Sequence, residues 1–379
     1  MIDWSQEQRK LRESFSGCHA ALSDGHVRDD RESVFSREKW DLIRDSGLLR
    51  LPFAQEWGGL GHDLLTTMYV LEGLGYGCRD AGLNFSVSTH MNSAGIPIQR
   101  FGSAELKQRY MPRICDGASI GAHAITEPEA GSDAMSMGTT ATADGDEFVL
   151  EGRKAYISNG PVAELFVVYA RTDAGRDFRG VTAFLVERDT LGLTVGEPVE
   201  KMGLRSSPFC ELTFENCRVP STNVIGRRGG GFLILEHVMV WEILCLFVMT
   251  VGDMQFRLER CLRHARTRRQ FGEPIGSFQS VADKLVEMKM GVETARKWLY
   301  DTAERHSNRE NVTVDIAIAK LLTSEANVAA AMAAVQLFGA SGYVTEHGIE
   351  KDLRNAIAGT IYSGTSEMQR RRIATLLGL

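Results

Sequence analysis

The order of apolar and polar residues changes twice along the chain, and each change marks a boundary in the expected fold. In the first part, apolar residues recur at helical spacing, as where Leu11 and Phe15 follow Trp4, and strand patterns are few. A further apolar run follows Ser36-Arg-Glu-Lys, where the serine hydroxyl can cap the first helical turn. The pattern predicts an N-terminal helical domain over residues 1–119.

From residue 120 the pattern becomes one of short β-rich segments. An Asp144-Gly145 pair between two of these segments is typical of a hairpin turn. The β pattern ends near Pro220, shortly before a run of three glycines at 229–231. We therefore predict a middle β-domain over residues 120–226. Its segments are expected at residues 148–150, 155–157, 165–169, 181–186 and 212–214.

Helical spacing then returns and continues to the end of the chain. An alanine-rich segment at 314–338 is long enough for a bundle helix, so we predict a helical bundle over residues 227–379 and an α+β fold class. A helical assembly interrupted by a β-domain leaves interdomain clefts, which are frequent cofactor sites. One expected helix face carries Val281, Leu285, Met288, Val292, Ala295 and Leu299.

Composition and charge exclude several classes of partner. Hydrophobic residues make up 43% of the chain, charged residues 24%, and the net charge is −6, with no basic tail for nucleic acid or anionic lipid. The stretch at 232–251 is long enough to cross a bilayer. It carries Glu236, His237 and Glu242, which are costly in hydrocarbon, so we interpret it as a buried helix and expect no membrane.

Cysteines, histidines and glycine motifs narrow the chemistry further. The seven cysteines include no C-x-x-C pair and the start of the sequence has no export signal, which favours free thiols and a cytoplasmic location. The nine histidines are dispersed, so we expect no metal site. Neither a P-loop nor a G-x-G-x-x-G string after a strand is present, which disfavours a Rossmann-type dinucleotide fold.

Glu242 is the clearest electrostatic anomaly in the sequence. Large apolar residues surround it on every face of its expected helix. A carboxylate in such a setting needs a cationic partner or is driven toward its protonated form. Glu242 is therefore either a general base, an ion-pair partner of an arginine on a neighbouring helix, or a residue in a solvent-facing slot.

Three further segments could hold an anionic or polar ligand. Thr126-Glu-Pro-Glu-Ala-Gly-Ser-Asp133 offers hydroxyl donors and a glycine for close approach, although it could equally be a surface turn. Arg266-Thr-Arg-Arg-Gln-Phe-Gly272 places three arginines on about one helical turn, either for pyrophosphate or as a solvated helix end. Ile361-Tyr-Ser-Gly-Thr-Ser-Glu367 breaks two helices, either as an oxyanion site or as a plain loop.

Taken together and in this order, the motifs resemble those of the acyl-CoA dehydrogenase superfamily over essentially the whole chain. This resemblance implies an N-terminal helical domain, a β-barrel-like middle domain and a C-terminal four-helix bundle. It also implies FAD-dependent desaturation of an acyl thioester. The motifs are Ala124-Ile-Thr-Glu-Pro-Glu-Ala-Gly-Ser-Asp133, Lys154-Ala-Tyr-Ile-Ser-Asn-Gly160, Arg268-Arg-Gln-Phe-Gly272, Gln336-Leu-Phe-Gly339 and Gly364-Thr-Ser-Glu367.

The resemblance also implies where FAD binds. Tyr156 matches an aromatic residue against the flavin ring, and Ser158 matches a hydroxyl residue near flavin N5. Arg268 and Phe271 match residues that reach FAD held mainly by a neighbouring subunit, which implies a homo-oligomer, usually a tetramer in this family. The remaining FAD contacts implied by the resemblance are Ile125, Thr126, Ser132, Gln336, Gly339 and Thr365.

Two departures from the family pattern concern catalysis. Many members carry the catalytic glutamate directly before the last Gly-Thr, where this chain has Ser363. In the branch that includes isovaleryl-CoA dehydrogenase, the base lies 26 residues before the arginine of Arg-x-x-Phe-Gly, and that position here is Glu242. Ile243 replaces the arginine that usually follows this base, which affects the expected recognition of the thioester.

The resemblance implies a mechanism but leaves the substrate open. Glu242 would remove the α-proton while a hydride leaves the β-carbon for flavin N5, and the backbone N–H of Ser363 with an FAD ribityl hydroxyl would stabilise the enolate oxygen. Similarity to prolyl-carrier-protein dehydrogenases makes a carrier-bound acyl or aminoacyl group an alternative to acyl-CoA. The electron acceptor is then an electron-transfer flavoprotein or O2. Two further functions stay open, namely a redox-silent flavoprotein that uses Glu242 for proton transfer or elimination, and an inactive scaffold.

Overall fold

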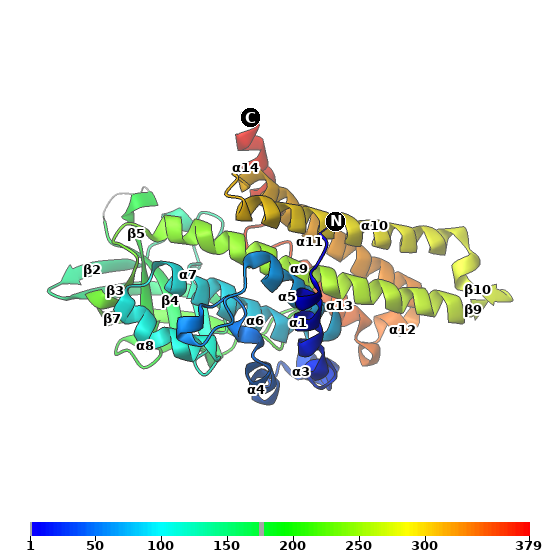
Figure 1. Ribbon diagram of the computed structural model, residues 1–379, viewed down its shortest axis with the longest axis horizontal. Coiled ribbons are helices and arrows are strands. Elements are labelled where there is room, and N and C mark those ends of the chain that lie inside the picture. The colour runs from blue at the N-terminus through cyan, green and yellow to red at the C-terminus, as the bar shows by residue number, and fades with distance from the viewer. Residues whose placement is uncertain (1, 174–177) are drawn as a thin grey trace.

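A computed structural model describes residues 2–173 and 178–379 of the chain. Short helices form its N-terminal part, and serine or aspartate side chains cap several of them (Figure 1). The Ser36 hydroxyl accepts the backbone N–H of Lys39 at 3.2 Å, as the sequence predicts. The helices are α1 (Gln6–Ser14), α2 (His19–Ser23), α3 (His26–Glu32), α4 (Arg37–Ser46), α5 (Leu64–Gly77), α6 (Ala81–Ser88), the π-helical segment Thr89–Gly95, α7 (Ile96–Phe101) and α8 (Ala104–Cys115).

The middle part is a single sheet at one end of the molecule (Figure 1). Its strands follow the order β6-β7-β3-β2-β4-β5-β8, and β1 pairs in parallel with β4. Asp144 pairs with Glu147 across a tight turn in which Gly145 has a φ of +64°, which confirms the predicted hairpin. The strands are β1 (Gly121–Ala124), β2 (Thr140–Asp144), β3 (Glu147–Ser158), β4 (Leu165–Arg171), β5 (Val181–Glu187), β6 (Leu193–Val195), β7 (Phe209–Pro220) and β8 (Val224–Ile225).

The C-terminal part is a bundle of long helices built around α9. This helix contains 37 residues and is therefore about 55 Å long, since each residue adds 1.5 Å. It runs from the sheet through the bundle to the far end of the molecule (Figure 1). The helices are α9 (Gly231–Thr267), α10 (Gln279–Ser307), α11 (Thr313–Phe338), α12 (Ala340–Tyr343), α13 (Ile349–Ala358) and α14 (Ser366–Leu376).

The apolar stretch on α9 is a core element that packs against α5, α10 and α11. Its residues from Ile243 to Met249 are all buried, which confirms the prediction of a buried helix. By length and composition α9 and α11 could each span a membrane, but this is weak evidence because core helices share these properties. Two glycines allow α9 and α5 to cross closely. A Cβ at Gly75 would lie 2.0 Å from the Met249 carbonyl oxygen, and one at Gly252 would lie 2.2 Å from the Glu72 carbonyl oxygen.

The prediction that Arg266, Arg268 and Arg269 share one helical turn is wrong for the last two. Helix α9 ends at Thr267, and the following residues form a two-stranded hairpin, β9 (Arg269–Gln270) and β10 (Glu273–Pro274). Phe271 and Gly272 form its turn with φ values of +51° and +86°. Arg268 itself is extended, with φ −70° and ψ 123°, so the helix ends at Thr267, and Arg268 and Arg269 lie beyond its end.

Candidate active site

Glu242 lies on α9 where this helix passes the N-terminal helices and the C-terminal loop. Its side chain is half-buried. Ser93 of the π-helical segment donates a hydrogen bond to Glu242 Oε2 at 2.6 Å, and Ser363 donates one to Oε1 at 2.5 Å. Each carboxylate oxygen is therefore held by a hydroxyl group from a different part of the chain.

No cation neutralises this carboxylate within the part of the chain that the structure describes. Glu242 makes no ion pair there, so the alternative of an arginine partner is wrong. Burial and then the charge of Glu242 raise the pKa of Tyr362 and of Tyr169 above the ordinary range. Burial lowers the pKa of His123, and Glu242 opposes this change. The charge of Glu242 therefore acts on three buried side chains around it.

Ser363 belongs to the loop between α13 and α14. Its backbone is left-handed, with a φ of +54°, and its carbonyl oxygen accepts the Gln369 Nε2 donor at 3.0 Å. Thr365 then caps α14 by accepting the N–H of Met368 at 3.3 Å. Among the described residues nothing accepts the backbone N–H of Ser363, so this donor is available to a ligand oxygen beside Glu242.

An aromatic wall stands next to the carboxylate. The rings of Phe85 and Tyr362 lie 5.0 Å apart between centroids, and those of Phe247 and Tyr362 lie 5.6 Å apart. Phe85, Tyr362 and Leu246, one turn beyond Glu242, line a cavity of about 50 Å³. Its other walls are largely polar and include Asn84, Asp253, Asn327 and Asn355. At about 15 Å³ for each water, the cavity holds roughly three small groups.

Four of the residues expected at the flavin lie together at the edge of the sheet. The carbonyl oxygen of Thr126 accepts the N–H of Ala155 at 2.9 Å, which joins the segment of Ile125 and Thr126 to that of Tyr156 and Ser158. Tyr156 has a φ of +59° at an irregularity in the β3–β7 pairing, and 63% of its surface is exposed. An aromatic ring presented in this way is suited to a planar ligand.

A buried ion pair holds this edge in place. Lys154 Nζ lies 2.7 Å from Glu127 Oε1 and donates to the Ile125 carbonyl oxygen at 3.1 Å. The Lys154 side chain has no exposed surface. Ser132 lies in the following exposed turn.

Thr365 lies in the loop of Ser363, whereas the four remaining expected FAD contacts lie at the opposite end of the molecule. Phe271 is 96% exposed and, with Gln336, lines a cavity of about 390 Å³, which we name the hairpin cavity. Arg268 and Gly339 are exposed beside it. Arg268 lies 26 residues after Glu242, or about 39 Å along the helix direction.

Three family models cover the chain in order. The acyl-CoA dehydrogenase N-terminal domain matches residues 5–118, the middle domain matches 122–217 and the C-terminal domain matches 229–378. The chain belongs to the acyl-CoA dehydrogenase family. It is therefore an FAD-dependent dehydrogenase, and the three-part fold predicted from its motifs is confirmed.

Individual relatives lie in the branch expected from the sequence. The L-prolyl-[peptidyl-carrier protein] dehydrogenase of Pseudomonas fluorescens is 39% identical over 361 residues, which cover 95% of this chain and 94% of that protein. The crystal structure of the prolyl acyl carrier protein oxidase AnaB superposes with a TM-score of 0.97 at 41% identity over the full length of both chains. The structure of PigA with FAD and proline has a TM-score of 0.97 at 36% identity, covering 100% of this chain and 99% of that one.

Sequence reasoning missed Ser93 and Phe85. Both lie in a continuous helical stretch of mixed small, polar and apolar residues, so no motif or charge anomaly singles them out. Ser93 and Glu242 are 149 positions apart in the sequence. They meet only because α9 packs against the π-helical segment in the tertiary structure.

Proposed function

We propose that the enzyme oxidises the Cα–Cβ bond of a short aminoacyl thioester that is attached to a peptidyl carrier protein, with Glu242 as the α-proton base. The observation that carries this proposal is a carboxylate with no cationic partner among the described residues, directed by hydroxyl groups of Ser93 and Ser363. The printed names of its relatives, a prolyl-carrier dehydrogenase and a prolyl-carrier oxidase, support the substrate class.

In this mechanism the chain supplies the base, the oxyanion donor and the orientation. Glu242 accepts the α-proton, and the two serine hydroxyls direct its oxygens toward that proton. The backbone N–H of Ser363 donates to the thioester oxygen as negative charge develops there. Bound FAD supplies the acceptor for the hydride that leaves the β-carbon.

The acyl pocket favours a short acyl group over a long chain. Phe85, Tyr362 and Leu246 line a cavity of only about 50 Å³, and Leu246 lies one turn beyond Glu242. A long hydrocarbon chain does not fit into this volume. A short acyl-CoA is the second candidate, because a rat short-chain acyl-CoA dehydrogenase is 37% identical over 91% of this chain and 83% of that protein.

We further propose that FAD lies between two chains of a homo-oligomer, with a tetramer as the expected assembly. The separation of about 39 Å between Glu242 and Arg268 along the direction of α9 supports this arrangement. The flavin end would contact Ile125, Thr126, Ser132, Tyr156, Ser158 and Thr365 of one chain. The other end would contact Arg268, Phe271, Gln336 and Gly339 of its neighbour.

Complementation between chains tests the shared site. Chains carrying Glu242→Gln or Arg268→Ala should each be inactive alone. When the two are coexpressed, mixed oligomers should regain activity, since one FAD site then has a wild-type base from one chain and a wild-type arginine from the other. Failure to regain activity in isolated mixed oligomers would contradict a site shared in this way.

We further propose a cytoplasmic location for the enzyme. The seven free cysteines support it, because a reducing compartment keeps thiols unpaired.

Anaerobic titration of the bound FAD tests the substrate class and the acceptor. The flavin absorbance should bleach with an L-prolyl thioester on a peptidyl carrier protein, and less with prolyl-CoA or butyryl-CoA. Bleaching by butyryl-CoA alone would favour the acyl-CoA alternative, and no bleaching by any thioester would favour a redox-silent flavoprotein. Peroxide release in air would then distinguish O2 from an electron-transfer flavoprotein as acceptor.

A further inference from the structure

A second cavity, of about 630 Å³, lies between the N-terminal helices and the C-terminal bundle. His26 of α3 and Arg79, which precedes α6, line one side, and Arg260 and Arg263 of α9 line the other. We name it the cationic cavity after these residues. Arg260 follows Glu242 by 18 residues, or about 27 Å along α9, so the cavity is separate from the proposed base. It shares no lining residue with the hairpin cavity.

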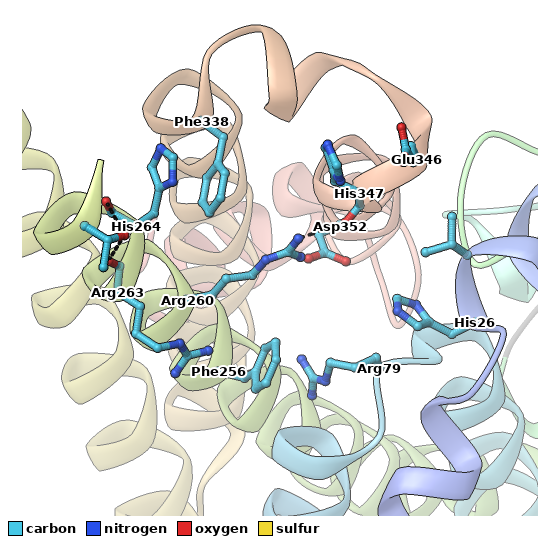
Figure 2. Close-up of a pocket in the computed structure, with 12 residues that line it drawn as sticks. His26, Arg79, Phe256, Arg260, Arg263, His264, Phe338, Glu346, His347 and Asp352 are labelled. Atoms are coloured by element: carbon cyan, nitrogen blue, oxygen red, sulfur yellow. Dashed lines mark hydrogen bonds between the residues drawn. The ribbon is translucent and has the colours of Figure 1, made fainter. Parts of the chain in front are cut away.

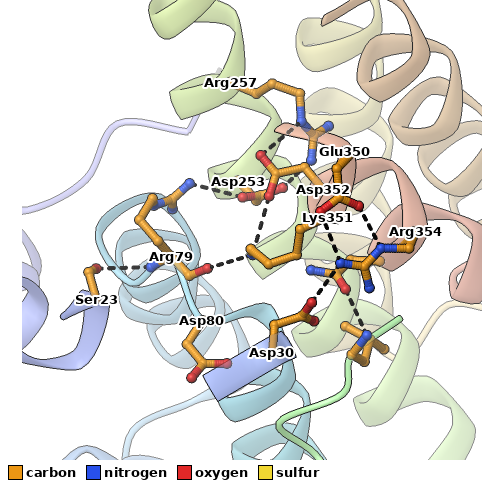
Figure 3. Close-up of polar contacts among 12 residues, drawn as sticks. Ser23, Asp30, Arg79, Asp80, Asp253, Arg257, Glu350, Lys351, Asp352 and Arg354 are labelled. Atoms are coloured by element: carbon orange, nitrogen blue, oxygen red, sulfur yellow. Dashed lines mark hydrogen bonds and ion pairs between the residues drawn. The ribbon is translucent and has the colours of Figure 1, made fainter. Parts of the chain in front are cut away.

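Carboxylates beside the cationic cavity are already engaged by other cations (Figure 3). Asp253 pairs with Arg79 at 2.9 Å and also with Arg257. Asp352 lies 3.3 Å from Lys351 and 3.9 Å from Arg257. These carboxylates therefore offset the inner cations and leave little negative charge for the arginines of α9.

Arg260 and Arg263 have no carboxylate partner among the residues that the structure describes. Arg260 donates to the carbonyl oxygen of His347 at 2.9 Å and lies 5.5 Å from the centre of the Phe338 ring. Arg263 is exposed, and its guanidinium group has no hydrogen bond within the same described residues. Two guanidinium groups that face one cavity thus keep most of their donors free.

Two buried donors or acceptors in the wall also lack partners. Neither Nδ1 of His26 nor Nε of Arg79 has a hydrogen-bond partner within the described chain. Figure 2 shows the side chains of His26, Arg79 and Arg260 pointing toward the middle of the cavity from different sides.

The surrounding side chains experience a positive field. Burial and then the charges of Lys351, Arg79, Lys39 and Arg260 lower the pKa of His26 to about 3. Burial would raise the pKa of Asp352, but Lys351, Arg257, Arg79 and Arg260 together lower it.

We propose that the cationic cavity binds a phosphate-bearing anion through the guanidinium groups of Arg260 and Arg263, whereas Arg79, whose terminal nitrogens already bond Asp253 and backbone carbonyl oxygens, adds only positive charge to the wall. Arginine forks match phosphate oxygens in geometry, and a phosphate group carries close to two negative charges near neutral pH. Among the residues that line the cavity, the cations Arg79, Arg260 and Arg263 outnumber the carboxylates Glu346 and Asp352.

Isothermal titration calorimetry on the FAD-loaded enzyme tests this site without depending on turnover. The probes are inorganic phosphate and adenosine 3′,5′-bisphosphate, in buffers whose ionic strength is held constant with potassium chloride. We expect one anion per chain. Arg260→Gln and Arg263→Gln should each weaken binding about 10- to 100-fold, because each removes a hydrogen bond to a charged group. Arg266→Gln is the matched control, because Arg266 is exposed on the same helix and does not line the cavity.

The outcomes distinguish binding of an anion in the cationic cavity from nonspecific attraction of anions to the protein surface. Tighter binding of the bisphosphate would identify a nucleotide phosphate as the ligand, whereas binding that is tighter for inorganic phosphate would identify the free ion. No saturable binding at millimolar concentration would overturn the proposal, as would an equal loss of affinity in Arg266→Gln. Arg263→Gln keeps the test valid if Arg260→Gln does not fold, since the Arg263 side chain is exposed and is not part of the core.

Discussion

Replacing Phe85 with alanine should lengthen the acyl group that the enzyme accepts. The Phe85 ring contacts Tyr362 and, with Leu246, lines the cavity of about 50 Å³ beyond the base. Removing the ring enlarges this cavity by the volume that the ring occupied. Each methylene buried there contributes about 0.8 kcal/mol, so a six-carbon acyl group should gain about 1.6 kcal/mol over a four-carbon group. This energy corresponds to about a 15-fold change in the ratio of their kcat/KM values.

The assay compares reduction of bound FAD by butanoyl, hexanoyl and octanoyl thioesters in the parent enzyme and in Phe85→Ala. Loss of the half-buried ring should also cost about 3 kcal/mol of stability or less, which thermal unfolding measures. Phe35→Ala is the matched control, because it removes a half-buried ring that does not line the cavity. An unchanged order of preference among the three thioesters in Phe85→Ala would refute the assignment of this ring as the end of the acyl pocket.

Two other variants address the base and the pH dependence of stability. Ser93→Ala should slow FAD reduction by substrate about tenfold or more, because the Glu242 carboxylate loses one of two directing hydrogen bonds. Ser88→Ala, on the same helical stretch, is the control and should reduce FAD at a rate within about threefold of the parent enzyme. Burial lowers the pKa of His90 to about 4, and its Nδ1 accepts the Gly121 N–H at 3.0 Å, which only the neutral ring can do. The unfolded ring binds its proton near pH 6.5, so this residue contributes stability above that pH and loses it on acidification. Between pH 7 and 5 the loss should be about 2 kcal/mol. Urea unfolding of His90→Gln should show a shallower pH dependence than the parent, and an identical slope would contradict this role for His90.

Periodicity was sufficient to divide the chain into helical, sheet and helical parts, and the apolar surroundings of Glu242 were sufficient to make it a candidate base. The helical spacing after Ser36, the Asp144-Gly145 turn and the buried face of α9 depend on local pattern, and the structure confirms each of them. Glu242 stood out because its neighbours along the chain are apolar, which is also a local property.

The partners of Glu242 required the tertiary structure. A carboxylate in an apolar segment suggests an arginine, but the chain instead supplies hydroxyl groups from residues 149 positions before it and 121 positions after it. Gly272 indicated that the helix would end nearby, but the structure ends it earlier, at Thr267, because Arg268 is already extended. The unpartnered donors of the cationic cavity likewise come from helices that are distant in sequence.

Anaerobic stopped-flow reduction of FAD in Glu242→Gln tests the central claim most directly. The glutamine keeps the shape of the side chain and can still accept from one serine, so FAD should remain bound at one per chain. A carrier-bound prolyl thioester that bleaches the flavin of the parent enzyme should leave that of the variant oxidised. Glu236→Gln, an exposed glutamate on the same helix, should behave like the parent. Full bleaching of Glu242→Gln at the rate of the parent would contradict Glu242 as the α-proton base.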